Sequence, residues 1–462
     1  MGISLVAVIA MQAHFFTNTG LYQLAESWGG SQSGINLIFS VDGISQPMML
    51  VTPFLFLISA LYSVQRFRTQ ATAGALPERE KLFWQMLLAL HSIVLIIFST
   101  QNVIVFFIAW ELFLLPVVVL TYLFGLEERK KAALKFFLYT FISSGFLIIG
   151  LIGIIYFQPR LGVDFDIRSS LVSDMQLVPP QKQALLFWCF MIAFLVKMPV
   201  FPWHAWLPLT HTQAPIQTLL LSGLFLKLGT YGILRFVIGN FGGIATLMSP
   251  MLIKVGLFTM LFGALVAWRQ KSFRYVIAYS SLAHMGLLLA GIFALNADGM
   301  AGAIFQNFSH SLVNALLFVI VGIHLSRNQT DDLSQIRAPQ SFIYWFAFSI
   351  AIFSAIGVPG TSGFIGEFLM FLGLSRASWP STVVALAALI LGAIYMLRLF
   401  HKVRGNPPSG PEITLSGIEK SVLIALSTAI LYFGIFPSLV ADGAHSQARA
   451  TTFAPVMRPG AQ

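Results

Sequence analysis

The chain has 462 residues, of which 57% are hydrophobic and 10% charged, and its mean hydropathy is +0.82. Soluble domains carry about a quarter charged residues, so this composition excludes an ordinary soluble enzyme and indicates a lipid bilayer as the solvent. Lys and Arg outnumber Asp and Glu by 27 to 17, but they are spread over short loops, which favours a role in membrane topology over nucleic-acid binding.

Apolar stretches long enough to cross a hydrocarbon core about 30 Å thick recur along the whole chain. They predict an all-α, polytopic membrane protein with about 13 transmembrane helices. Runs such as FFLYTFISSGFLIIGLIGIIYF are too long and too uniformly apolar for the strands of a transmembrane β-barrel. The expected spans are residues 2–17, 45–64, 82–99, 101–125, 132–157, 183–200, 216–237, 249–268, 273–297, 300–325, 341–372, 380–400 and 418–440.

Basic residues are divided unevenly between alternate loops, which predicts the orientation of the chain. One set of loops holds 17 of the 27: Arg66, Arg68, Arg79, Lys81, Arg129, Lys130, Lys131, Lys135, Arg269, Lys271, Arg274, Arg327, Arg337, Arg398, Lys402, Arg404 and Lys420. By the positive-inside rule this set is cytoplasmic, so the amino terminus is expected inside and the carboxyl terminus outside. The first stretch lacks a basic segment and a small-residue cleavage site, so we expect a retained helix rather than a signal peptide.

Spans three to seven and eight to twelve resemble two copies of one five-helix unit. The fourth span of each is interrupted, by FLVKMPVFPWHAWLP in one and AIGVPGTSGFIGEF in the other. Because five is odd, the second unit must cross in the opposite sense, as an inverted repeat. Paired breaks of this kind mark ion pathways in transporters, although a single Pro can also merely kink a packed helix. The expected divisions are residues 1–81 (amino-terminal helices), 82–237 (first repeat), 238–401 (second repeat) and 402–462 (carboxyl-terminal helix and tail).

Several ionisable residues lie within the expected spans. A charge near the bilayer centre costs about 2.5–3.5 kcal/mol even on a lenient scale, so each one suggests a function. Counted along their spans, these residues lie near mid-membrane or beside the two breaks, and they are Glu111, Lys197, Lys227, His284, His310 and Glu367.

These residue types suit proton transfer. A dry site favours a neutral Lys, a nearby carboxylate favours the charged form, and His changes its charge near physiological pH. We therefore expect the six to form a line of proton-carrying sites along the midplane. Two plainer interpretations stay open: Glu111 and Lys197 could form only a structural ion pair, and His284 and His310 could be ordinary buried histidines.

Other polar residues are weaker candidates. Lys135 is close enough to a membrane boundary to extend its amine into water. His204 and His211, in WHAWLPLTHTQAP, could feed protons from the cytoplasmic side or form a polar interfacial turn; their spacing fits no metal template, so no metal is expected. We interpret His91 and His324 as structural.

Five stretches resemble the signature sequences of the antiporter-like subunits of respiratory complex I. These stretches are WELFLLPVVVL around Glu111, FLVKMPVFPWHAWLPLTHTQAP around Lys197, LKLGTYGILRF around Lys227, SSLAHMG around His284 and GVPGTSGFIGEFLMF around Glu367. The similarity runs from about residue 35 to the carboxyl terminus. Glu367 matches the M type of the bacterial proton-pumping NADH:quinone oxidoreductase, because L-type and N-type chains are expected to carry Lys there. The family usually has fourteen spans, and a counterpart of the first is not found here. Either the start codon was placed late or the helix is absent, and this affects the amino-terminal packing but not the channel residues.

The resemblance implies a role for each site residue. Glu111 is similar to the acid that tunes the first half-channel, Lys197 to its central proton carrier and Lys227 to the connecting carrier. His284 and His310 resemble residues of the polar central axis, and Glu367 resembles the terminal site of the second half-channel.

The resemblance also implies a proton-translocating, multi-pass subunit of the inner (plasma) membrane, with the amino terminus cytoplasmic and the carboxyl terminus periplasmic. NADH, FMN, iron–sulfur clusters and quinone are expected in partner subunits, with no redox chemistry in this chain. The single cysteine, Cys189, and the lack of a nucleotide fingerprint agree with this. The expected neighbours are the L-type and N-type chains of the membrane arm.

The sequence leaves two other kinds of function open. Subunits of multisubunit sodium/proton antiporters and membrane-bound hydrogenases use the same helical unit, and cation choice depends on pocket geometry. A structural spacer is an alternative of another class, and it would predict that neutralising the buried charges affects assembly alone.

Overall fold

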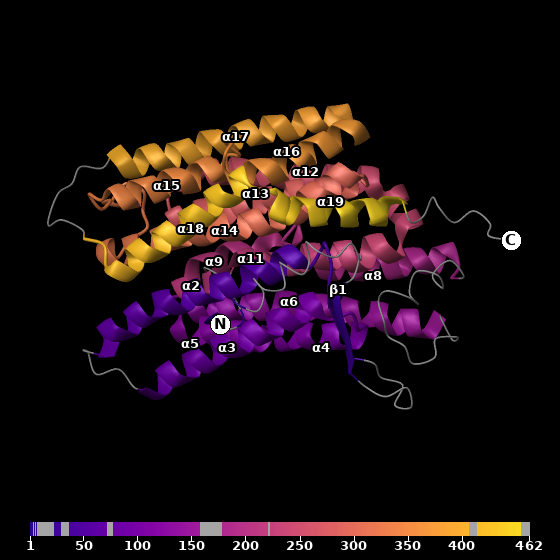
Figure 1. The fold of residues 1–462 in the computed structure, drawn as a ribbon, viewed down its shortest axis with the longest axis horizontal. Coiled ribbons are helices and arrows are strands. Elements are labelled where there is room, and N and C mark those ends of the chain that lie inside the picture. Colours follow the sequence, from indigo (N-terminus) through magenta and orange to yellow (C-terminus); the bar gives the residue numbers. More distant parts are fainter. Residues whose placement is uncertain are drawn as a thin grey trace.

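The structure, a computed structural model, describes residues 1, 2, 4, 6, 23–28, 37–71, 77–157, 178–219, 222–405 and 414–453. Its helices run along a common direction and form an elongated bundle (Figure 1). Within these ranges nine helices are long and apolar enough to cross a membrane. The all-α membrane architecture is confirmed. The count of 13 stays a prediction, and the expected span 2–17 lies almost entirely outside the described residues.

A short antiparallel pair of strands, β1 (Gln23–Trp28) and β2 (Leu37–Val41), precedes the helices and was not predicted. The first part of the bundle contains α2 (Gln46–Ala71), α3 (Pro77–Ser99), α4 (Val103–Leu112), α5 (Leu114–Phe124), α6 (Arg129–Phe157), α8 (Pro180–Lys197), η1 (Trp203–Ala205), α9 (Trp206–Gln213), α10 (Ile216–Leu219), α11 (Ser222–Gly232) and the π-helical η2 (Ile233–Ile238). The second part contains α12 (Gly242–Arg269), α13 (Phe273–Phe293), α14 (Ala297–Asn328), α15 (Phe342–Ala355), α16 (Ser362–Ala377), α17 (Trp379–Gly405), α18 (Gly417–Ile435) and α19 (Ser438–Phe453).

Helix α14 lies at the centre of the bundle. It packs against α2, α11, α13, α16, α18 and α19. In its most apolar stretch 94% of the residues are buried, whereas in the corresponding stretch of α17 only 28% are. On α17 and α6 the large apolar side chains point outward instead, as Ile390 and Ile152 do. Exposed apolar surface of this extent suits lipid or a neighbouring subunit and not water.

Both predicted helix breaks are confirmed. Helix α8 ends at Lys197, and the chain turns through residues 198–202 before η1 and α9. Helix α15 ends at Ala355, and the chain turns through residues 356–361 before α16. In this second turn Gly357 and Gly360 have φ of +68° and +90°, a left-handed conformation that glycine adopts without steric strain.

The expected span 101–125 contains a break that was not predicted. Helix α4 ends at Leu112 and α5 begins at Leu114, with Phe113 between them. Pro116 lacks a backbone N–H, so the Leu112 carbonyl cannot form its usual bond four residues along the helix. The interruption comes immediately after Glu111.

The last expected span, 418–440, was too long. Helix α18 ends at Ile435, and Pro437 then separates it from α19, because proline disfavours helical geometry in the residue before it. Helix α19 continues along the bundle beyond α18 (Figure 1) and packs against α14 and α2, and Gln46 Nε2 donates to the Leu439 carbonyl at 3.0 Å.

The five loops with most of the basic residues meet at one end of the bundle. Ion pairs join some of these loops: Arg274 Nε lies 2.8 Å from Asp331 Oδ2, and Arg327 lies 2.7 Å from Glu419. Arginine side chains also donate to backbone carbonyls, Arg398 to Trp268 and Arg274 to Thr212. Two further hydrogen bonds complete the network, from Leu126 N to the Gln213 carbonyl at 2.8 Å and from Ser416 Oγ to Gln65 Oε1 at 2.7 Å. We refer to this region as the basic end. Which side of the membrane it faces stays a prediction.

Candidate functional site

Lys197 is buried against aromatic rings at the first break. Its side chain is 1% exposed, and Nζ lies 4.2 Å from the centre of the Phe113 ring, 5.0 Å from Trp110 and 5.5 Å from Phe136. Nζ has no hydrogen-bond partner among the described residues. Aromatic faces attract cations, most strongly where water is excluded, so the three rings supply the closest stabilisation of the ammonium.

These rings were missed in the sequence. Trp110 and Phe113 flank Glu111 in the WELF stretch, which was the available signal, whereas Phe136 comes from another helix. We refer to the rings of Trp110, Phe113 and Phe136 as the aromatic cage. Trp110 Nε1 donates to Ser144 Oγ at 3.3 Å, and the Phe136 ring packs edge-on against the Trp206 ring with centres 5.3 Å apart. These contacts hold two of the three rings in position.

Glu111 lies near Lys197 but not in contact with it. Its carboxylate interacts electrostatically with the Lys197 amine, but no ion pair joins them within the described part of the chain. The Oε1 atom is buried and has no hydrogen-bond partner there either. The plain interpretation as a direct structural ion pair therefore loses support.

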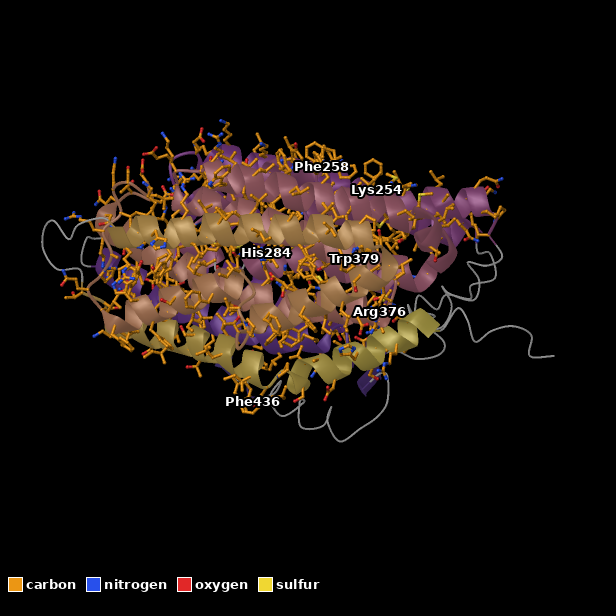
Figure 2. All side chains as sticks on the ribbon, turned by 90° about the horizontal axis from the view of Figure 1, so that it is seen from above. Lys254, Phe258, His284, Arg376, Trp379 and Phe436 are labelled. Carbon is orange, nitrogen blue, oxygen red and sulfur yellow. The ribbon has the colours of Figure 1, made fainter. Side chains whose placement is uncertain are left out.

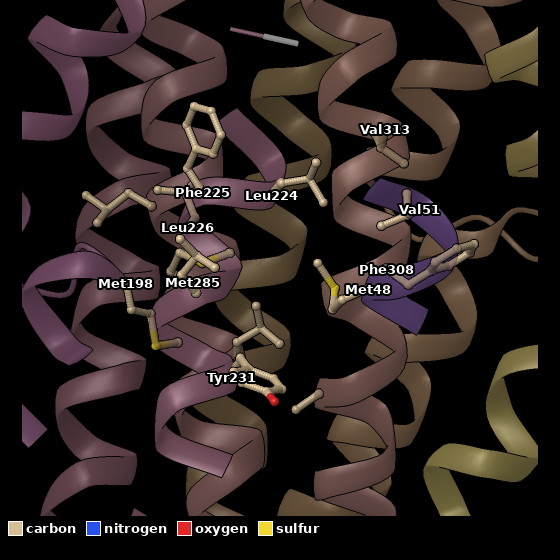
Figure 3. Close-up of a cluster of buried hydrophobic side chains, with 14 of the residues drawn as sticks. Met48, Val51, Met198, Leu224, Phe225, Leu226, Tyr231, Met285, Phe308 and Val313 are labelled. Carbon is tan, nitrogen blue, oxygen red and sulfur yellow. The ribbon is translucent and has the colours of Figure 1, made fainter. Parts of the chain in front are cut away.

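Lys227 is enclosed between four helices. Its side chain has no exposed surface, and Nζ lies 3.6 Å from Met285 Sδ on α13. Figure 3 shows the apolar side chains of this region, which come from α2, the first break, α11, α13 and α14: Met48, Val51, Met198, Leu224, Phe225, Leu226, Tyr231, Met285, Phe308 and Val313. A buried amine in such surroundings is costly unless charge is compensated nearby or the amine is neutral.

Close backbone packing fixes the position of α11. A Cβ on Gly229 would lie 2.6 Å from the Phe194 carbonyl oxygen of α8, and one on Gly223 would lie 2.8 Å from Ser311 Cα of α14. Thr230 Oγ1 also donates to Asn307 Oδ1 at 2.8 Å. Lys227 therefore lies between the first break and α14, although no direct contact joins it to Lys197 within the part of the chain that the structure describes.

His284 and Glu367 form a buried pair. His284 Nε2 lies 3.2 Å from Glu367 Oε1, and Glu367 is 3% exposed. On its other side, His284 Nδ1 lies 2.8 Å from the Ser280 carbonyl. The His310 ring is 5.2 Å from the His284 ring, centre to centre, and it interacts electrostatically with Lys227 and His211.

His284 and Glu367 lie close enough to share a proton. A carbonyl can only accept a hydrogen bond, so a proton on His284 Nδ1 suits its contact with Ser280. Neither carboxylate oxygen of Glu367 has a hydrogen-bond partner among the described residues, so the approach of His284 Nε2 to Glu367 Oε1 at 3.2 Å is a close contact and not a formed hydrogen bond. A proton between these two atoms would join them, either as imidazolium with carboxylate or as neutral imidazole with carboxylic acid.

A small polar cavity lies beside the pair. Its volume is about 10 Å³, enough for about one water molecule. Polar side chains from α13, α14 and α15 line it, and they are Ser280, Ser281, His284, Gln306, Ser309, His310, Asn314 and Ser354. Several of these sit in the stretch FQNFSHSLVN of α14, whose polar residues were a sequence signal that went unused.

Tyr395 was also missed. Its hydroxyl donates to Ser280 Oγ at 3.0 Å and it interacts electrostatically with Glu367. It comes from α17, which is otherwise mostly exposed. A lone Tyr in an apolar helix gave no sequence signal for this role.

The weaker candidates fall into two places. Lys135 and His204 interact electrostatically near the first break, and the His204 ring stacks on Phe201 at 5.5 Å. His211 is buried, with its ring 5.7 Å from Phe318 of α14, and it interacts with His310. His211 thus lies between the basic end and the group formed by His310, His284 and Glu367.

The two histidines interpreted as structural have ordinary partners. His324 Nε2 lies 2.7 Å from the Tyr344 hydroxyl, and His91 Nε2 lies 3.3 Å from Ser4 Oγ. His91 also packs edge-on against Phe56, with ring centres 5.0 Å apart. Within the described part of the chain, neither histidine contacts any of the six residues expected to carry protons.

A buried ion pair that was not predicted joins the start of α2 to η2. Arg235 Nη1 lies 2.5 Å from Asp42 Oδ2, and Nη2 lies 2.9 Å from Oδ1. Burial raises the pKa of the Asp42 carboxyl, but Arg235 and hydrogen bonds from Ser45 outweigh it, and the pKa falls below its usual value. Asp42 lies before the expected span 45–64, so a search for charges within spans passed over it, whereas Arg235 lies near the end of the expected span 216–237 and was overlooked.

Comparison with known proteins gives a consistent result. Residues 100–392 match the family model described as NADH:quinone oxidoreductase/Mrp antiporter, TM. The NADH-quinone oxidoreductase subunit M of Rickettsia felis is 33% identical over 450 residues, which cover 95% of this chain and 88% of that protein. The NAD(P)H-quinone oxidoreductase chain 4 2 of Thermosynechococcus vestitus is 32% identical over 446 residues, which cover 92% and 80%.

Solved structures show the same fold. A chain of respiratory complex I from Thermus thermophilus with bound NADH superposes with a TM-score of 0.87 at 26% identity, covering 98% of this chain and 93% of that one. A chain of the Mrp complex from Dietzia sp. superposes with a TM-score of 0.80 at 22% identity, covering 98% and 91%. The second likeness concerns the fold alone.

Proposed function

The chain belongs to the NADH:quinone oxidoreductase/Mrp antiporter transmembrane family, and we infer that it is a proton-translocating membrane subunit of NADH:quinone oxidoreductase, respiratory complex I. The observation that carries this proposal is that ionisable side chains at membrane depth are enclosed within the bundle. Lys197, Lys227, His310 and Glu367 are all buried. Charges kept away from lipid, at such cost, mark ion pathways in membrane proteins.

The chain is part of an enzyme whose membrane arm contains related subunits beside it. NADH oxidation and quinone reduction take place in other subunits, which hold FMN, the iron–sulfur clusters and the quinone. Their free energy reaches this chain as shifts of charge and hydration along the arm. We place it in the inner (plasma) membrane with the amino terminus cytoplasmic and the carboxyl terminus periplasmic.

The first half of the proton route runs through Glu111, Lys197 and Lys227. Glu111 acts on Lys197 through space, so a change in the charge or position of Glu111 changes whether the Lys197 amine holds its proton. The aromatic cage holds the ammonium without a direct counter-ion, which leaves the proton free to move on. Lys227, on the helix packed against the first break, is the next carrier.

The second half of the route runs through the histidines to Glu367. Lys227 and His310 interact electrostatically, and His310 lies beside His284. His284 can pass a proton between its two nitrogens. The proton held between His284 and Glu367 is the terminal store of this half.

The secondary candidates serve as proton entries in this proposal. Lys135 with His204 leads to the first break, and His211 leads to His310. A cavity of about 540 Å³ opens near His211 at the basic end, between α2, α5, α14 and α18, and Arg327 and Glu419 line it. Its lining combines apolar side chains with polar ones such as Gln65, Gln217 and Ser326, and a cavity of this size admits water, which can carry protons inward.

Substitution of the first-half residues tests the function. Glu111→Ala and Lys197→Ala should each abolish or severely reduce pumping while the complex still assembles, since the proton site is lost and packing elsewhere is kept. Proton transport per NADH oxidised is measured in reconstituted vesicles. Lys131→Ala is the control, because Lys131 forms only an exposed pair with Glu128. Full pumping stoichiometry in either test variant would refute the assigned roles.

The same experiment separates the alternatives. A structural spacer predicts that both variants pump normally once assembled. The fold does not choose the cation, since the Dietzia Mrp chain shares it. We propose protons because Lys and His bind protons, whereas a sodium ion needs several oxygen ligands, and the line of sites consists mainly of nitrogen groups. Pumping that required sodium would favour a role as a sodium/proton antiporter subunit.

A further inference from the structure

Three cationic side chains share one surface cavity at the basic end. The cavity measures about 420 Å³ and is lined by Trp268, Arg269, Lys271 and Arg398. The first three residues come from the end of α12 and the turn after it, and Arg398 comes from the neighbouring helix α17. Among the described residues, no carboxylate lines this cavity.

The cationic groups are held in place by the protein. Arg398 donates a guanidinium hydrogen bond to the Trp268 carbonyl, and the Arg269 guanidinium lies 5.7 Å from the centre of the Trp268 ring. The Asp332 carboxylate interacts electrostatically with Lys271. It supplies one negative charge beside three positive ones. Like charges gathered at one place repel, and a bound anion relieves this repulsion.

The surface next to the cavity is apolar. Leu265 on α12 is 48% exposed, and Ile394 and Leu397 on α17 are 46% and 38% exposed. Further along α12, Phe258 also projects from the outer surface of the bundle (Figure 2). All of these lie on the side of the cavity toward the centre of the spans, where acyl chains would lie in a bilayer.

We propose that this cavity binds the phosphate of an anionic phospholipid, with its acyl chains along the exposed faces of α12 and α17. Arginine guanidinium groups match phosphate geometry with two parallel hydrogen bonds, and Lys adds a point charge. The Trp268 indole suits the interfacial depth of a headgroup. The three basic residues line one cavity together with apolar side-chain surface, and basic pockets of this kind hold lipid headgroups.

Lipid retained by the purified complex tests the proposal. The intact complex is prepared with the double substitution Arg269→Gln and Lys271→Gln and exchanged with phosphatidylglycerol and phosphatidylcholine, and bound lipid is counted by native mass spectrometry. Each lost charge should weaken phosphatidylglycerol binding about fivefold, which corresponds to about 1 kcal/mol per basic residue. Lys420→Gln, exposed at the same end but outside the cavity, should retain the wild-type amount. Equal retention by the double variant would overturn the proposal.

A second measurement needs no change to the charged residues. In vesicles containing brominated phosphatidylglycerol, the fluorescence lost by the wild-type complex but not by a Trp268→Phe complex reports lipid at Trp268. Brominated phosphatidylcholine at the same level should quench Trp268 less. Equal quenching by both lipids, or complete displacement by millimolar inorganic phosphate, would overturn the assignment to a lipid, because the latter would show that the cavity binds free phosphate instead.

Discussion

At the scale of single residues, Lys197 contacts three aromatic rings where a buried cation would ordinarily have a carboxylate. Removing one partner of a direct buried ion pair costs about 3–5 kcal/mol, whereas a cation–π contact contributes about 0.5–2 kcal/mol. A proton held by the weaker interaction leaves more readily. In the proposed route, Glu111 acts on Lys197 at longer range, through its charge, without contacting the amine.

Glu367 gives a sharper test of proton storage. Glu367→Gln keeps the size of the side chain and can still donate a hydrogen bond to His284 Nε2, but the amide cannot gain or lose a proton at neutral pH. We expect the complex to assemble and pumping to fall about a hundredfold, the lower end of what a positioned acid or base contributes. Proton uptake by reconstituted vesicles, normalised to NADH oxidation, measures this.

The control for Glu367 is a carboxylate outside the bundle. Glu128→Gln changes the same group on an exposed side chain and should leave pumping unchanged. Wild-type pumping by Glu367→Gln would mean that the His284 pair stores no proton on the route.

At the scale of elements, the two breaks place charged groups where helix backbone would otherwise run. Lys197 ends α8 at the first break, and Glu367 sits in the second turn of α16 after the other. Gly357 packs so closely on Glu367 Oε2 that a Cβ would collide with it. Backbone freed by a break is tolerated at membrane depth only where protein or water satisfies it, so the breaks bring polar groups to the same depth as the charges.

The close packing of α11 on the first break leads to a prediction about Gly229. In Gly229→Ala the new Cβ would meet the Phe194 carbonyl oxygen and the Met198 nitrogen at 2.6 and 2.7 Å, so α11 must move away from α8. Overpacking of this kind costs about 1–3 kcal/mol. We expect a lower Tm for the complex and weaker pumping, since Lys227 moves with α11.

Gly145→Ala is the matched control. Gly145 also lies inside a helix, and a Cβ there would meet no atom within 4 Å. Because alanine favours the helix, this variant should keep or slightly raise the Tm. If Gly229→Ala behaved in the same way, close packing between α11 and the break would not matter for the function.

At the scale of the whole molecule, the basic end is a network of contacts that joins all five basic loops. Within the network, burial raises the pKa of the Asp331 carboxyl, but bonds and charge from Arg274 outweigh it and the pKa falls below its usual value. This pair therefore stabilises the fold above about pH 4 and loses its contribution as the pH falls further.

The orientation of the molecule can be tested by labelling from each side. Cys189 is buried, and Cys189→Ser provides a background without thiols. In that background, Lys420→Cys at the basic end should react with a membrane-impermeant maleimide from the cytoplasmic side alone. Gln181→Cys, exposed at the start of α8 at the opposite end, should react from the periplasmic side alone. Reaction of both from one side, or the reverse pattern, would contradict the predicted topology.

The sequence by itself determined the membrane class, the approximate spans, the two breaks and most of the buried ionisable residues. Hydropathy, proline and glycine act locally, and a charge within an apolar run is visible from its neighbours alone. For the same reason, most helix bounds were close. The interruption at Phe113 and the separate helix α19 follow from Pro116 and Pro437, so these local signals were present in the sequence but were passed over.

Only the tertiary structure decided which of these charges meet. The ring of Phe136 reaches Lys197 from another helix, His284 pairs with Glu367 across 83 positions of sequence, and Tyr395 reaches Ser280 from α17. The basic cavity between α12 and α17 likewise joins distant segments. A side chain's position on its own helix follows from the local sequence, but the rotation and spacing of neighbouring helices depend on packing over the whole bundle. Proton transfer requires distances of a few ångströms, and those are set at this level.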